Sequence, residues 1–101
     1  MSQAGFQLEG RAEGTLAVSG VLTFDTAHAA LRALRGKLAS GSFSTLDLAS
    51  VERIDSAGLS CVLAVLAGAR SQGQSLAVRH LPDSLRALAH VCEVEGLLAV
   101  A

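Results

Sequence analysis

The sequence predicts a single α/β domain that spans residues 1–101 and is built on a mixed β-sheet. Three observations lead to this class: a hairpin pattern at the start, an alternation of strand and helix patterns after it, and a composition in which 50% of the residues are hydrophobic and 17% are charged. A chain of 101 residues can bury a core that needs neither a metal nor disulfides. Strands that alternate with helices after a hairpin favour later strands that are parallel, with right-handed crossovers.

The first third of the chain shows the hairpin and a helix. Residues 6–8, the turn-like run 12–14 and the alternating apolar residues up to Gly20 are typical of a β-hairpin. A helix is predicted next, because apolar residues recur at spacings of three and four as far as position 38, and Asp25 or Thr26 can cap its start. We interpret the basic residues of this helix as a solvated face: Arg32, Arg35 and Lys37.

The middle of the chain predicts a strand and a second helix. Leu46-Asp47-Leu48 is a short strand of the buried type, and a helix runs from about Ser56 to Gln72, with Gly73 as its stop. A fourth strand follows at 76–80.

The C-terminal part predicts a third helix, and Leu85, Leu88 and Cys92 line one face of it. Residues 97–100 form either a closing strand or a docked tail. We therefore expect a sheet of four to five strands, with three to four helices packed mainly on one face.

The second helix has an unusual surface. Its 14 residues from Ser56 to Ala69 include no charged residue. One stripe is apolar and suits the sheet: Leu59, Val62, Leu63 and Leu66. An opposite stripe consists of small residues: Ser60, Ala64, Ala67 and Ser71. An exposed uncharged face of this kind predicts a protein interface, and the alternative is a helix that its own fold buries on both sides.

Two polar residues stand at the start of this helix. Asp55 and Ser56 both suit an N-cap position, and capping alone is one interpretation of them. The other is that Ser56 presents its hydroxyl at a helix N-terminus, where a phosphate is also tolerated. The sequence leaves both interpretations open.

Composition and motifs exclude several classes of function. The net charge is −1, and three Phe with no Trp or Tyr provide no basic stripe or stacking platform for nucleic acid. No phosphate-binding loop, dinucleotide fingerprint or nucleophile elbow occurs, so we expect neither an enzyme nor a cofactor. His28, His80 and His90 are isolated, and His90 and Cys92 point in different directions on a helix, which predicts no metal site.

The cysteines and the lack of sorting signals predict a cytoplasmic protein. Cys61 and Cys92 are too few for a disulfide framework, and both are interpreted as small core residues or interface fillers. No signal-peptide pattern opens the chain, and the apolar run 59–69 is shorter than the roughly 20 residues that span a bilayer. We expect no direct membrane insertion.

The run LDLASVERIDSAGL at 46–59 resembles the signature of STAS domains (sulfate transporter and anti-sigma factor antagonist). That signature is a strand, a short loop and then Asp-Ser/Thr-x-Gly-Leu at the start of a helix, and the order of elements is similar over nearly the whole chain. The resemblance implies the STAS fold and a regulatory role without catalysis. In the anti-sigma antagonist branch a partner kinase phosphorylates the hydroxyl residue after the Asp, which is Ser56 here.

A second segment is more similar to another branch of the family. Antagonists usually carry Gly-Glu-Leu/Ile-Asp at the end of the second strand, whereas this chain has GVLTFDT at 20–26 and lacks both acids. This segment resembles the STAS subunit of Mla-type phospholipid ABC transporters, which implies an accessory subunit that binds the cytoplasmic ATPase subunit and is peripheral at the inner membrane. The alternative partner is an anti-sigma factor kinase. The expected contact residues are Asp55, Ser56, Ala57, Gly58, Ser60, Ala64, Ala67 and Ser71.

Overall fold

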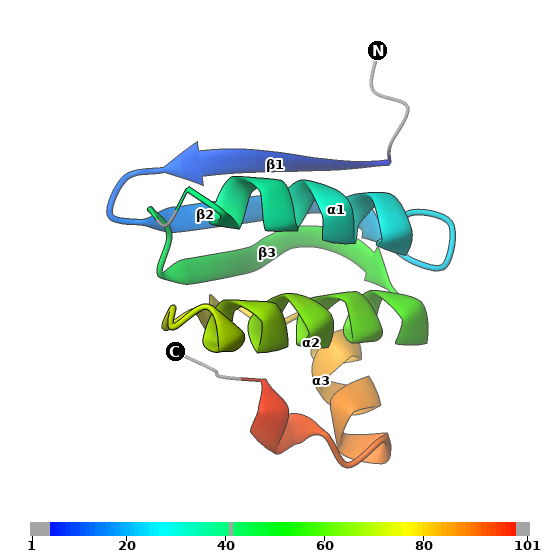
Figure 1. Cartoon of the computed structure of the whole chain (residues 1–101). Helices are drawn as coiled ribbons and strands as arrows, with labels where there is room; N and C mark the ends of the chain where they lie inside the picture. Colours follow the sequence, from blue (N-terminus) through cyan, green and yellow to red (C-terminus); the bar gives the residue numbers. More distant parts are fainter. Residues whose placement is uncertain (1–4, 41, 99–101) are drawn as a thin grey trace.

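The computed structural model describes residues 5–40 and 42–98, in which four strands form one sheet (Figure 1). The elements are β1 (Phe6–Arg11), β2 (Thr15–Leu22), α1 (Ala27–Leu38), β3 (Thr45–Ile54), α2 (Ser56–Ser71), β4 (Ala77–Arg79), α3 (Asp83–Val91) and the 3-10 helix η1 (Glu95–Leu97). The strand order is β1-β2-β3-β4; β1 is antiparallel to β2, and the other pairs are parallel. The mixed α/β sheet and its opening hairpin are therefore confirmed.

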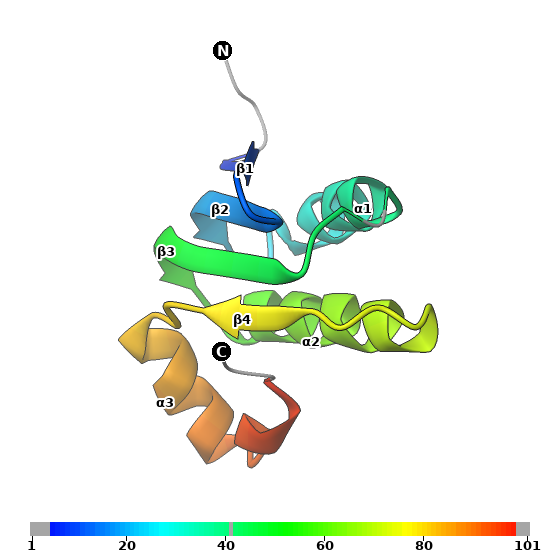
Figure 2. The same cartoon turned by 90° about the vertical axis from the view of Figure 1, so that its left-hand side faces the viewer.

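The helices cover the sheet unequally. Figure 2 shows α1 and α2 side by side on one face, while α3 lies beyond the β4 edge. The core between the sheet and the two covering helices consists of fully buried aliphatic side chains, among them Leu16, Val18, Leu34, Leu48 and Val62. Leu98 is buried after η1, and residues 99 and 100 of the expected closing strand or tail lie outside the described residues.

β3 is longer than the sequence pattern indicates. It continues through Ile54, so the loop expected between strand and helix shrinks to Asp55 alone. The pairing with β2 shifts register twice along this stretch, which moves the inward positions from Leu48 to Val51 and then to Ile54. Because a bulge breaks the two-residue alternation of a strand, the pattern at 49–53 resembles a loop.

The ends of α2 and α3 test two further expectations. The stop at Gly73 is confirmed, since Gly73 has φ +78° and the next N–H, that of Gln74, donates to the Ala69 carbonyl. The expectation for Cys92 is wrong, because α3 ends at Val91 and leaves Cys92 exposed. The buried positions of α3 are Leu85 and Ala89, four residues apart.

The parallel strands place three connections at one edge of the sheet. β2, β3 and β4 all end there, and α1, α2 and α3 each begin within a few residues of the preceding strand (Figure 1). The segment 23–26 and the first turn of α2 are consequently neighbours. This edge holds Asp55 and Ser56, and the stripe of small residues runs away from it along α2.

Candidate functional site at the N-terminus of α2

Asp55 caps α2 and ties it to the β2–α1 connection. Its Oδ1 accepts hydrogen bonds from the Ala57 N–H (2.9 Å) and the Gly58 N–H (3.1 Å), and its Oδ2 accepts one from the Phe24 N–H (3.0 Å). The Gly58 N–H is the main cause that holds the pKa of Asp55 below its usual value, and the N–H groups of Phe24 and Ala57 act in the same direction. Asp55 therefore stays ionised and rigidly held.

Ser56 is the first residue of α2, and its side chain is exposed. Within the described residues no hydrogen bond engages its hydroxyl, because Asp55 already accepts from the N–H groups of the first turn. Capping thus accounts for Asp55 but not for Ser56. The hydroxyl is presented to solvent at a helix N-terminus.

Gly58 has a structural task in this turn. It is buried, and a Cβ there would overlap the carbonyl oxygen of Leu22 and lie 2.6 Å from Cγ1 of Ile54. The absence of a side chain lets α2 start directly against the end of β2. Gly58 thus positions the turn, while the half-buried Ala57 lies at its surface; the expected contact of Gly58 with a partner stays a prediction.

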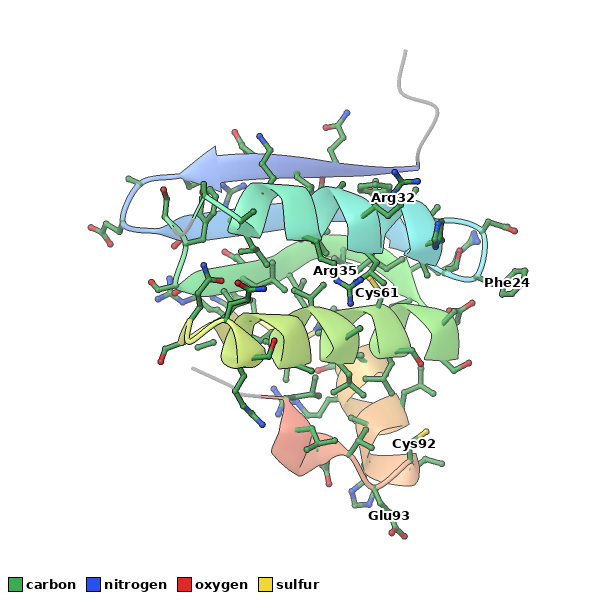
Figure 3. All side chains as sticks on the ribbon, viewed as in Figure 1. Phe24, Arg32, Arg35, Cys61, Cys92 and Glu93 are labelled. Carbon is green, nitrogen blue, oxygen red and sulfur yellow. The ribbon has the colours of Figure 1, made fainter. Side chains whose placement is uncertain are left out.

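The connection between β2 and α1 is held by Thr26. Its buried hydroxyl donates to the Val21 carbonyl (2.8 Å) and accepts from the Thr23 N–H (3.0 Å). Thr26 occupies the N-cap position of α1, as one of the two expected residues, but its side chain makes no capping bond to the helix. The same connection presents Phe24, which is 82% exposed and points away from the ribbon (Figure 3).

The outer face of α2 is open. The apolar stripe faces inward at Leu59, Val62 and Leu66, which are buried, whereas its fourth member, Leu63, is half-buried. The small residues face outward: Ser60, Ala67 and Ser71 are exposed and Ala64 is half-buried. The interpretation of α2 as a helix buried on both sides by its own fold is therefore wrong.

A groove runs along each side of this outer face. One lies between α1 and α2, with Arg35, Gly68 and Gln72 among its lining residues. The other lies between α2 and η1 and is lined by Leu63, Ala64, Leu66, Ala67, Arg70 and Leu97. α2 thus forms a low ridge of small, uncharged residues with an arginine on either side.

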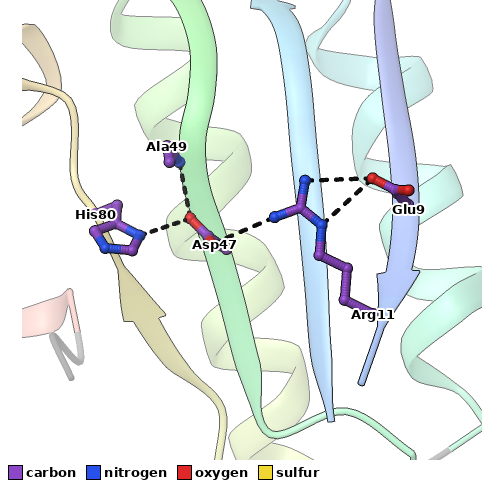
Figure 4. A network of polar contacts seen from close by, with 5 residues as sticks. All are labelled: Glu9, Arg11, Asp47, Ala49 and His80. Carbon is purple, nitrogen blue, oxygen red and sulfur yellow. Dashed lines mark hydrogen bonds and ion pairs between the residues drawn. The ribbon is translucent and has the colours of Figure 1, made fainter. Parts of the chain in front are cut away.

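A second polar cluster lies on the sheet face opposite α1 and α2 (Figure 4). Asp47 Oδ1 accepts a hydrogen bond from the Ala49 N–H (2.9 Å) and lies 3.0 Å from His80 Nδ1. Asp47 Oδ2 lies 3.9 Å from Nη1 of Arg11. Burial raises the pKa of Asp47, but these three partners outweigh it and hold the pKa below 3.8. The cluster joins β1, β3 and the end of β4. The hydrogen bond from the Ala49 N–H to Asp47 satisfies a backbone donor that lies close to the first register shift between β2 and β3.

The remaining titratable residues occupy separate places. His28 is exposed, and Nδ1 of His90 lies 3.0 Å from Glu95 Oε1. Cys61 is buried, which raises the pKa of its thiol to about 11. Across residues 5–40 and 42–98, no three His, Cys, Asp or Glu side chains come together as metal ligands would. None of the helices in these two ranges is both long enough and apolar enough to cross a bilayer.

Comparison with known proteins identifies the family. The family model described as "Mlab, STAS domain" matches residues 6–99, which is nearly the whole chain. The protein is a STAS domain of the Mlab family. No protein of curated function matches this STAS domain in sequence.

Solved structures share the fold of this STAS domain. A putative anti-sigma factor antagonist from Thermotoga maritima aligns with a TM-score of 0.75 and 18% identity, over 94% of this chain and 84% of that one. An anti-sigma factor antagonist from Mycobacterium paratuberculosis gives 0.69 and 20%, over 98% and 87%. The phosphorylated form of the Bacillus cell fate determinant SpoIIAA gives 0.66 and 16%, over 95% and 90%.

The sequence signals for the site were uneven. Asp55 and Ser56 were indicated by the capping pattern and by the STAS signature. Phe24 belongs to the segment 20–26 that resembles the Mla-type subunit, but its exposure does not follow from the sequence pattern. The one available signal was an aromatic residue two positions before the N-cap Thr26, where polar residues are usual.

Proposed function

We propose that this STAS domain is a non-catalytic accessory subunit that binds the cytoplasmic ATPase subunit of a phospholipid-trafficking ABC transporter. The contact surface consists of the first turn of α2 and its outer face: Asp55, Ser56, Ala57, Ser60, Ala64, Ala67 and Ser71. The observation that carries the proposal is the exposed, uncharged outer face of α2 in a chain of the Mlab family. Such faces on small domains mark protein contacts.

The small residues suit this task for a physical reason. Serine and alanine side chains let another backbone approach closely and lose little conformational entropy on burial. The lack of charge between Asp55 and Arg70 avoids the cost of desolvating ions at the centre of an interface. The same proposal includes the location of the protein: it lies in the cytoplasm and is held peripherally at the inner membrane through the ATPase subunit.

A second function is favoured by one observation, the free hydroxyl of Ser56. In an anti-sigma factor antagonist regulated by phosphorylation, a partner kinase would modify this residue. Solvent access and a helix N-terminus both suit a phosphoserine at this position. The similarity to the phosphorylated SpoIIAA structure supports this alternative.

Co-purification of the full chain with the ATPase subunit of an Mla-type transporter tests the first function. Replacement of Ala67 by Arg should abolish the complex, because a long charged side chain on the ridge prevents close approach. Ala67 is exposed, so the substitution should leave the thermal unfolding of the free domain unchanged.

The matched control is Ala87→Arg, which adds the same side chain at an exposed position of α3 outside the proposed surface. The control should bind the ATPase like the wild type. A folded Ala67→Arg variant that still binds the ATPase would remove the α2 face from the interface and contradict the proposal.

A further inference from the structure

The most exposed large apolar side chain of the described residues belongs to the β2–α1 connection. Phe24 is 82% exposed, compared with 78% for Val91 and 52% for Leu97. Figure 3 shows the Phe24 ring projecting from the end of the molecule at which α2 begins. Aromatic side chains contribute disproportionately to binding when a partner pocket covers them.

The backbone of Phe24 is fixed before any partner binds. Its N–H donates to Asp55 Oδ2 at 3.0 Å, and the neighbouring Thr23 N–H is held by the Thr26 hydroxyl. A preordered backbone lowers the entropy that a partner must remove on binding. The ring is therefore carried by a rigid support at the edge of the α2 face.

The helices that form this face also carry an asymmetric charge. Within α1 and α2 there are four cationic side chains, Arg32, Arg35, Lys37 and Arg70, and no acidic residue. None of these cations forms an ion pair with another described residue. Arg35, Lys37 and Arg70 lie in the last turns of the two helices, whereas Asp25 and Asp55 flank Phe24 near the first turns.

We infer that Phe24 is the anchor of a protein interface whose other end is electrostatic. The partner is a protein surface with an apolar pocket that receives the Phe24 ring and with acidic side chains that face the C-terminal ends of α1 and α2. The uncharged ridge of α2 lies between these two points. The inference rests on the proposed function only in taking the α2 face as the contact surface.

The distribution of charge favours a protein over a lipid surface. An anionic bilayer attracts cations and accepts an aromatic ring where the two lie together. Here the ring lies between Asp25 and Asp55, whereas three of the four basic residues, Arg35, Lys37 and Arg70, lie in the last turns of the helices. A protein partner can match both ends separately, which also fixes the orientation of the complex.

Binding measurements on the full chain test the inference with the ATPase subunit and, in parallel, with a kinase-type anti-sigma factor. Phe24→Ala should weaken the complex by at least about 30-fold, the scale of an interface hot spot. Val91→Ala, at an equally exposed apolar position on α3, should change the affinity by less than about twofold. Arg70→Glu should slow association at low salt and flatten its salt dependence, whereas Arg86→Glu on α3 should do neither.

The outcomes separate the two proposals. If Ala67→Arg abolishes ATPase binding while Phe24→Ala behaves like Val91→Ala, the proposed function stands and the anchor is overturned. If only the anti-sigma factor binds and Phe24→Ala weakens it, the anchor stands and the transporter function fails. Phe24-dependent binding to vesicles that contain anionic phospholipid, or equal effects of Arg70→Glu and Arg86→Glu, would overturn the protein surface proposed here.

Discussion

Asp55 and Phe24 are joined by a hydrogen bond of 3.0 Å although 31 positions separate them in the sequence. The same carboxylate caps α2 with its other oxygen, so one side chain serves both the helix and the loop. Substitutions can separate these two tasks.

Asp55→Asn keeps one carbonyl oxygen for the first-turn N–H groups, but its amide NH2 cannot accept from Phe24. Asp55→Ala removes both interactions. We expect the melting temperature to decrease from wild type to Asp55→Asn to Asp55→Ala, with faster amide exchange at Phe24 in both variants. Equal melting temperatures for the three proteins would show that the carboxylate does not hold the loop.

Gly58→Ala should be strongly destabilising, because the new methyl group overlaps the Leu22 carbonyl oxygen and crowds Ile54. Overpacking of this kind costs about 1–3 kcal/mol in the free energy of unfolding. Gly68→Ala is the matched control, since nothing lies within 4 Å of a Cβ at that position of α2. Urea unfolding should show this variant to be as stable as the wild type or more so.

The acid stability of the domain should depend on Asp47. Its pKa in the folded protein lies below the unfolded value of 3.8, so its contribution to stability is present above that pH and is lost as the pH falls through the lower, folded pKa. The difference in the free energy of unfolding between wild type and Asp47→Asn should therefore shrink below pH 3.8. Urea titrations over a pH series measure this difference, and a pH-independent difference would exclude Asp47 as its source.

Replacement of Ser56 distinguishes the two candidate functions. For an antagonist, Ser56→Asp should abolish binding to the anti-sigma factor and Ser56→Ala should preserve it, because the unmodified form binds. For a transporter subunit that uses the hydroxyl as a contact, both changes should weaken ATPase binding. Stoichiometric, kinase-dependent phosphate on Ser56, detected by mass spectrometry of protein from the native host, would decide for the antagonist.

The two thiols should differ sharply in reactivity. Cys61 is buried with a pKa of about 11, whereas Cys92 is exposed at the end of α3. A thiol reagent at neutral pH should label Cys92 rapidly and Cys61 only after the domain unfolds. Rapid labelling of two thiols in the folded protein would mean that α2 opens from the sheet.

The sequence predicted elements where hydrophobic periodicity was regular. The ends of α1 and α2 were anticipated within a residue or two, because leucine and alanine spacing and Gly73 mark them clearly, and the hairpin was anticipated although β1 extends three residues past the expected 6–8. The prediction was poor where the backbone departs from a regular period, as in the bulged second half of β3. It also failed at Cys92, where an apolar spacing continued past the last residue of α3.

The site was predictable in part for the same reason. Local patterns report on the helix start at Asp55 and Ser56, but not on contacts between distant segments. The strand order produces three contacts between distant segments: the hydrogen bond between Asp55 and Phe24, the close approach of the Leu22 carbonyl to Gly58, and the polar cluster around Asp47. Each of these required the three-dimensional arrangement.

The parallel order of β2 and β3 makes the proposed surface a discontinuous epitope. A peptide that covers α2 carries Ser56 and the ridge but lacks Phe24, and a peptide that covers the β2–α1 connection lacks both. A partner that needs both segments recognises only a chain whose sheet has formed, so its binding reports folding. At a free concentration of about 100 times its Kd, such a partner would add about 2.7 kcal/mol to the free energy of unfolding, and the domain would be most resistant to unfolding within its complex.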